Sequence, residues 1–233
     1  MLDPLDEDWS VALAVVAHPD DMEYGAAAAV ARWTDQGKSV VYCLVTKGEA
    51  GIAGMAPEVV GPLRMAEQHA SCDVVGVTDV RFLDHPDGLV EESTALRRDL
   101  TAVIRDVRPD VIVSINHRDS WGGPSWNHVD HRAVGRALLD AARDAGNEWI
   151  FPDAGQAWDG VRFVAFNASP QASHTVDVTN TIDRGIASLE CHRTYLDALA
   201  DPTDPEAFLR GNAEAAARDT PFDLAATFEI VVV

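Results

Sequence analysis

Short apolar runs alternate with longer amphipathic stretches along most of the chain. The short runs indicate buried strands, and the stretches with apolar residues spaced three and four apart indicate helices. The predicted strands are residues 11–17, 39–46, 80–83, 110–116, 160–168, 173–178 and 225–233. The predicted helices are residues 22–36, 58–74, 91–107, 128–144, 179–199 and 205–217.

This alternation predicts βαβ units and therefore an α/β fold built on a parallel sheet. Right-handed crossovers would place helices on both faces of the sheet, which makes a three-layer sandwich. The pattern is less regular after residue 160, so we expect a mostly parallel sheet with an irregular C-terminal part. No linker, repeat or low-complexity segment interrupts the sequence. We therefore predict a single domain over residues 1–233.

Two polar loops follow predicted strands that should be neighbours. The segment HPDD follows the first strand, and HRDSWGGPSWNHVDH follows the fourth. In open α/β sheets, ligands bind beyond the carboxyl ends of the strands, where the strand order reverses, and in the common order the first and fourth strands meet there. The turn after the first strand lacks the glycine fingerprint GxGxxG, which argues against a dinucleotide site.

The two loops carry residues that can bind a metal ion. His18, Asp21 and His131 supply two imidazoles and one carboxylate, a set that suits a catalytic zinc site or a non-haem iron site. The adjacent carboxylates of Asp20 and Asp21 repel each other, and a cation would offset that repulsion. Asp20 would then remain free as a general base beside the metal. The alternative is that one of these aspartates only caps the following helix.

The net charge and the cysteine content limit the possible binding partners and the expected cellular compartment. The net charge is −20, from 38 acidic and 18 basic residues, so the surface should repel nucleic acids and anionic lipids. The N-terminal segment lacks the features of a signal peptide, and no apolar run is long enough to span a bilayer. The three cysteines are widely separated, which favours a reducing cytoplasm. We expect a cytoplasmic protein with a small-molecule substrate and neither a nucleic-acid nor a membrane partner.

The stretch AHPDDMEYG resembles the first motif of the PIG-L/LmbE-like zinc-dependent de-N-acetylases, and HVDH resembles the second motif of that family, HxDH. The resemblance implies a Rossmann-like fold and removal of an acetyl group from an N-acetylglucosamine-type amide. It implies that Zn²⁺ binds His18, Asp21 and His131. His128 would stabilise the oxyanion and help to protonate the leaving amine, and Asp130 would orient a histidine ligand.

The resemblance extends to residues that would contact the substrate. RMAEQ, which contains Arg64, is similar to the family's RxxE, and Asp87 belongs to a similar DG pair. We predict that Arg64 and Asp87 hold sugar hydroxyls or an anionic group. Arg64 pairing with Glu67 on an exposed helix face, and Asp87 acting as a turn residue, are the alternatives. Trp126, where some relatives carry tyrosine, is a third predicted substrate contact.

The sequence also departs from the family in ways that leave the exact substrate open. Met22 follows HPDD where the family usually has glutamate, and the final family motif is reduced here to His192 and the residues after it. Our leading hypothesis is a zinc-dependent amide hydrolase acting on an N-acylated amino sugar or glycoside. A non-haem iron oxygenase or redox enzyme on the same residues, and a non-catalytic carbohydrate-binding protein, are the alternatives. A homo-oligomer is compatible with the sequence.

Overall fold

The computed structural model describes residues 2–200 and 204–233. These residues form one eight-stranded sheet in the order β1-β7-β8-β6-β5-β2-β3-β4. The strands are β1 (Asp3–Pro4), β2 (Val11–Val16), β3 (Ser39–Leu44), β4 (Asp79–Phe82), β5 (Val111–Ile115), β6 (Phe163–Asn167), β7 (His174–Asp177) and β8 (Ala225–Val232). The helices are α1 (Ala27–Asp35), α2 (Pro57–Val75), α3 (Thr94–Val107), α4 (Val129–Ala145), α5 (Ile182–Glu190), α6 (Arg193–Ala198) and α7 (Pro205–Ala217).

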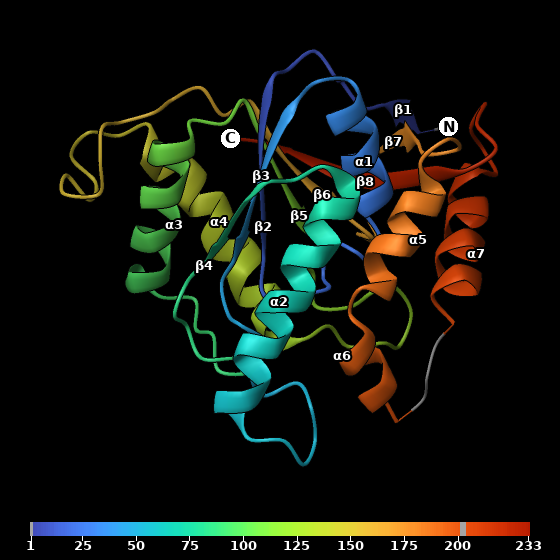
Figure 1. The fold of residues 1–233 in the computed structure, drawn as a ribbon. Coiled ribbons are helices and arrows are strands. Elements are labelled where there is room, and N and C mark those ends of the chain that lie inside the picture. The colour runs from blue at the N-terminus through green and yellow to red at the C-terminus, as the bar shows by residue number, and fades with distance from the viewer. Residues whose placement is uncertain (1, 201–203) are drawn as a thin grey trace.

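Helices cover both faces of the sheet, which confirms the predicted three-layer α/β sandwich. Helices α3 and α4 lie on one face, and α1, α2, α5 and α7 lie on the other (Figure 1). Strand β2 is apolar throughout because both of its faces are buried. Ala14 and Val16 belong to one buried cluster, and Leu13 and Val15 belong to the cluster on the opposite face of the sheet. A strand buried on both sides cannot alternate apolar with polar residues.

The strand order places the two polar loops together. Strand β2 pairs in parallel with β3 on one side and with β5 on the other. The prediction that the first and fourth long strands are neighbours is therefore confirmed, and the loops after β2 and β5 leave the same edge of the sheet. The irregular C-terminal part is also explained, because β8 runs antiparallel to both β6 and β7.

Two predicted helices differ from those in the structure. The helix expected from residue 22 begins only at Ala27, since residues 19–26 form turns in which the carbonyl of Met22 accepts hydrogen bonds from three successive backbone N–H groups. The helix expected over residues 179–199 is divided into α5 and α6 near His192. The short strand β1 was not predicted. Across the described residues, no helix has both the length and the apolar character needed to cross a membrane.

Candidate metal centre

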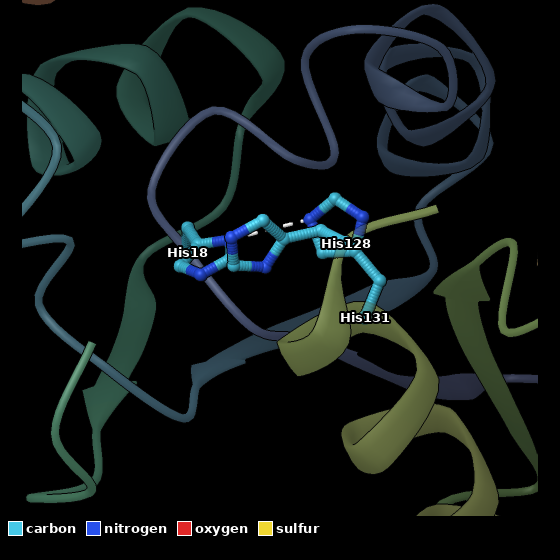
Figure 2. A group of neighbouring side chains, drawn as sticks. All are labelled: His18, His128 and His131. Atoms are coloured by element: carbon cyan, nitrogen blue, oxygen red, sulfur yellow. Dashed lines mark hydrogen bonds between the residues drawn. The ribbon is translucent and has the colours of Figure 1, made fainter. Parts of the chain in front are cut away.

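The loop after β2 and the first turn of α4 bring three histidines together. The ring centroids of His18 and His128 are 5.0 Å apart, those of His18 and His131 are 5.2 Å apart, and those of His128 and His131 are 5.3 Å apart. Figure 2 shows the three rings side by side above the start of α4. His128 is the N-cap of α4, so His131 follows one turn later on the same side of the helix.

A strained turn presents the neighbouring aspartates. Asp20 has a φ of +83°, a left-handed conformation that few non-glycine residues adopt. Two contacts hold it there: its backbone N–H donates to Gln68 Oε1 at 3.0 Å, and its carboxylate lies 3.0 Å from Arg64 Nη2. The turn closes where the backbone N–H of His18 donates to Asp21 Oδ2 at 2.8 Å. Asp20 and Asp21 therefore point to different partners although they are adjacent.

The candidate ligand atoms are spaced as ligands around one ion would be. His131 Nε2 lies 3.2 Å from His18 Nδ1 and 3.1 Å from Asp21 Oδ1, and His18 Nδ1 lies 3.5 Å from Asp21 Oδ2. Ligand atoms about 2.1 Å from a tetrahedral zinc ion are about 3.4 Å from one another. Only small adjustments of these side chains would therefore be needed to coordinate the ion.

The hydrogen bonds indicate one arrangement of ring protons for His18 and His131 as metal ligands and another for His128. His18 Nε2 donates to Asp130 Oδ2 at 3.1 Å, and His131 Nδ1 donates to Asn127 Oδ1 at 3.0 Å. In the neutral form that binds a metal ion, each ring therefore has its other nitrogen, His18 Nδ1 or His131 Nε2, free and directed at Asp21. In His128 the arrangement is reversed, because its Nδ1 accepts from the backbone N–H of Asp130 at 3.2 Å. Neutral His128 consequently carries its proton on Nε2 and is a hydrogen-bond donor.

The charges around His18 also favour the binding of a cation. Burial disfavours the charged form of His18, but Asp21, Asp130 and Asp87 outweigh burial and raise its pKa well above the ordinary value. Burial likewise disfavours ionised Asp21, yet His131 and His18 hold its pKa well below the ordinary value. A cluster that draws a proton onto a buried imidazole would bind a divalent cation in its place.

Two other groups have possible ligand atoms close enough to share an ion: His18, His128 and His131, and His18, Asp87 and Asp130. Asp130 is completely buried and accepts backbone N–H bonds from Gly88 at 2.7 Å and from Val90 at 3.1 Å. Its oxygens are therefore already occupied, and its place behind His18 suits an orienting carboxylate. We infer that His18, Asp21 and His131 form the metal site.

Arg64 and Asp87 lie where a substrate could meet them. Both line a cavity of about 250 Å³ that also contains Asp20, His128 and the metal-site residues. Asp87 Oδ1 lies 3.1 Å from His18 Nε2, and Asp87 Oδ2 accepts from the backbone N–H of Ala50 at 2.8 Å. Trp126 is 69% exposed, stacks with Arg132 and lines neither of the two cavities beside the metal site. Its contact with substrate stays a prediction.

Arg64 is buried, not displayed on an exposed helix face. Its Nη2 donates to the carbonyl of Pro19 at 2.6 Å, and its guanidinium stacks on the ring of Tyr195 at 3.9 Å. Gly48 and Gly51 leave the space that this guanidinium fills, since a Cβ at Gly48 would lie 2.4 Å from Arg64 Nη1. Burial raises the pKa of Asp20, and the Arg64 cation opposes that rise. Arg64 therefore holds the HPDD turn in addition to any substrate contact.

We expect Arg64→Met to lower the free energy of unfolding by about 3–5 kcal/mol at pH 9, because it leaves the Asp20 carboxylate buried without its cation. Urea unfolding of EDTA-treated protein measures this change. The loss should shrink as the pH falls below about 8, since burial raises the pKa of Asp20 to about 8 in the folded state and the carboxylate then takes up a proton there. The control is Arg193→Met, whose exposed partner is Asp197, with a cost below about 1 kcal/mol. Equal losses in the two variants would contradict this account.

Three residues that support the site were not assigned a role from the sequence. Gln68 bridges the turn, because it accepts from Asp20 and donates to Glu23 Oε1 at 2.8 Å. It lies one helical turn after Arg64, and that spacing was the available signal. Asn127 fixes the tautomer of His131, and Tyr195 covers Arg64. The partners of Asn127 and Tyr195 are distant in sequence or depend on loop geometry, so no local pattern reveals them.

Comparison with known proteins finds one family over the site-bearing part of the chain. Residues 13–142 match the PIG-L family, described as GlcNAc-PI de-N-acetylase. The diacetylchitobiose deacetylase of Thermococcus kodakarensis is 26% identical over 80% of this chain and 70% of its own length. The 1D-myo-inositol 2-acetamido-2-deoxy-alpha-D-glucopyranoside deacetylase of Kineococcus radiotolerans is 31% identical over 61% of this chain. The match covers about half (48%) of that relative's length.

Solved structures share the fold over nearly the whole chain. The N,N'-diacetylchitobiose deacetylase from Pyrococcus horikoshii superposes with a TM-score of 0.86 at 22% identity, over 97% of this chain and 85% of its own. GalB, the 4-carboxy-2-hydroxymuconate hydratase from Pseudomonas putida, superposes with a TM-score of 0.76 at 20% identity, over 96% of this chain and 97% of its own. Because a deacetylase and a hydratase both have this fold, the architecture alone does not define the reaction.

Proposed function

The chain belongs to the PIG-L family of GlcNAc-PI de-N-acetylases, and on that premise we propose that it is a zinc-dependent hydrolase that removes an acyl group, such as acetyl, from an N-acylated amino sugar or glycoside. The observation that carries the proposal is the division of roles among the three histidines. Neutral His18 and His131 would turn unprotonated nitrogens toward Asp21 and a bound metal ion, while neutral His128 would present an N–H. A protein that only binds a carbohydrate would not require the hydrogen-bond donor of His128.

The roles follow from the positions of the side chains. Zn²⁺ held by His18, Asp21 and His131 would supply a Lewis acid for the acyl carbonyl and would lower the pKa of a water molecule. Asp20 lines the same cavity, and burial raises its pKa above the ordinary value, in the direction that suits a general base working near neutral pH. Asp20 would take the proton of the attacking water.

His128 acts on the other reacting atoms. Its Nε2–H would donate a hydrogen bond to the oxygen on which negative charge develops, and the proton that Asp20 takes from the water would then pass to the departing amine. Burial and the neighbouring His18 lower the pKa of His128, which keeps the ring neutral before the reaction. Asp130 would keep Nδ1 of His18 directed at the metal, because it accepts the proton of Nε2.

The polar cavity would hold the sugar. Arg64 and Asp87 line it, and we propose that their remaining polar atoms contact sugar hydroxyls or an anionic substituent. Deacetylation of diacetylchitobiose and of a glucosaminyl inositol by the named relatives supports a sugar amide as substrate class. Which N-acylated sugar or glycoside is the natural substrate depends on groups beyond the reacting amide.

Incubation with N-acetylglucosamine, diacetylchitobiose and the acetylated glucosaminyl inositol tests the proposal. We expect acetate and free amine in equal amounts from at least one of them. EDTA should abolish the release, and added Zn²⁺ should restore it. Both products should form at the same rate without oxygen. If none of these amides is cleaved, or if turnover needs Fe²⁺ and oxygen, the hydrolase assignment is wrong and the iron-enzyme alternative gains support.

A further inference from the structure

A larger cavity lies on the other side of the metal site. It has a volume of about 580 Å³, begins at Asp21 and His131, and extends between the sheet and helices α5 and α7. Most of its wall is apolar, with Ile115 and Trp121 near the metal site and Ile182, Phe208 and Leu209 on the helices. Trp121 stands edge-on to His131, with ring centroids 5.8 Å apart.

The two cavities meet at the metal site and differ in chemistry. Asp21, Tyr24 and His131 line both, but Asp20 and His128 line only the smaller, polar one. An amide whose carbonyl lies at the metal has an amine side and an acyl side. The groups that exchange protons with the leaving amine must face the amine side. The larger cavity therefore lies on the acyl side.

We propose that the larger cavity binds the hydrocarbon chain of a medium-length fatty acyl group, so that the preferred substrates are N-acyl amino sugars with about eight to ten acyl carbons. This proposal rests on the hydrolase function proposed above. A cavity of about 150 Å³ is enough to hold benzene. The space beside Asp21 is nearly four times larger, and an acetyl methyl group would leave most of it unfilled.

Two polar side chains of the cavity wall already have hydrogen-bond partners. Asn167 Nδ2 donates to the carbonyl of Thr227 at 3.1 Å, and Glu23 Oε1 accepts from Ser71 at 2.6 Å and from Gln68 at 2.8 Å. A hydrocarbon chain would leave these bonds intact. Small residues on the helices and on β8, among them Gly185, Ala216 and Ala226, leave the width that the chain requires.

A series of N-acyl glucosamines from acetyl to decanoyl tests the proposal, with the free amine as the readout. Each buried methylene contributes about 0.8 kcal/mol, or about fourfold, and ordering of the chain offsets part of that gain. We expect kcat/KM to rise by about twofold per methylene, so that octanoyl exceeds acetyl by at least about 50-fold. Cleavage of the acetyl compound with no gain, or with a fall, for longer chains would overturn the acyl-chain proposal and leave the hydrolase function standing.

A substitution within helix α7 gives the matched variant. Ala216→Phe places a ring in the cavity, and Ala215→Phe places the same ring at the adjacent exposed position. We expect Ala216→Phe to lower the octanoyl-to-acetyl ratio of kcat/KM by at least about tenfold, and Ala215→Phe to leave that ratio unchanged. A similar ratio in both variants would refute the location of the chain.

Binding of decanoate separates this proposal from the hydrolase function. Calorimetric titration of the zinc-loaded protein should show decanoate binding at least about tenfold more tightly than butanoate. Ala216→Phe should remove that difference. If no N-acyl glucosamine is cleaved but decanoate still binds in this way, the hydrolase assignment fails and the cavity remains an acyl-chain site. Equal affinities for the two carboxylates would overturn the acyl-chain proposal directly.

Discussion

Asp20→Asn is expected to retain the metal and to reduce kcat by about 10²- to 10⁴-fold, the usual contribution of a general base. Asparagine is nearly isosteric and is among the residues that tolerate the left-handed conformation seen at Asp20, where φ is +83°. The turn and Asp21 should therefore keep their geometry. What disappears is the carboxylate that accepts the proton of the attacking water.

Steady-state kinetics and metal analysis of the same preparation check this prediction. Asp84→Asn is a control, because Asp84 is an exposed partner of Lys47 and lines neither cavity beside the metal site, and it should keep normal kcat and zinc. The acidic limb of the kcat/KM profile should change in Asp20→Asn, since the base that titrates there is gone. Near-normal kcat in Asp20→Asn, or loss of zinc from it, would mean that the base lies elsewhere or that Asp20 shares the metal.

His131→Ala and His128→Ala should have opposite effects on the metal although the two residues lie one helical turn apart. His131→Ala removes a ligand, so we expect its zinc content after dialysis to fall to near zero, together with activity. His128→Ala should keep its zinc and lose activity, because His128 presents an N–H and no free nitrogen lone pair to the site. His18→Ala and Asp21→Ala should behave like His131→Ala.

Zinc-to-protein ratios measured by plasma emission spectrometry decide between these outcomes. His69→Ala, at an exposed position on α2, is the control and should bind zinc normally. Full zinc retention by the His18, Asp21 and His131 variants would show that the metal site has been wrongly located. Loss of zinc from His128→Ala to the same extent as from His131→Ala would show that the three histidines act as one ligand set.

The removal of Asn127 offers a weaker test of the same arrangement. Asn127 Oδ1 fixes the tautomer of His131, and its Nδ2 donates to the backbone carbonyls of Asn116 and Arg118 at 2.7 and 2.9 Å. Removal of the hydrogen-bond partner of a metal-binding histidine typically lowers the metal affinity by about 10- to 100-fold. Asn127→Ala should therefore weaken zinc binding by that factor without abolishing it, which a competition titration with a chelating dye would measure.

The local sequence determined much of the architecture and the chemistry at its centre. Hydrophobic periodicity was enough to locate seven of the strands and most helices, because burial on one or both faces dictates which positions are apolar. The alternation of strands and helices predicted a parallel sheet, and the common order of such sheets brought His18 and His131 to one edge. Residue type then limited the chemistry, since imidazole and carboxylate are metal ligands and proton carriers.

Tertiary contacts decided what local patterns do not encode. The conformation of Asp20 depends on Gln68 and Arg64, which lie more than forty residues away on α2. A helical pattern cannot show whether Arg64 faces solvent or is buried beneath Tyr195, because that depends on how α2 and α6 pack. Likewise, the sequence could not show which tryptophan of the loop after β5 lies beside His131, and the course of that loop placed Trp121 there.

The apolar cavity is the clearest case of a feature that only the folded chain has. Its walls come from the turn after β2, from β5, α5, α7 and β8, segments separated by up to about two hundred residues. Each of these segments alone looks like an ordinary core-facing helix or strand. Whether their small and apolar side chains meet or leave a space depends on helix positions and strand register, which long-range packing sets.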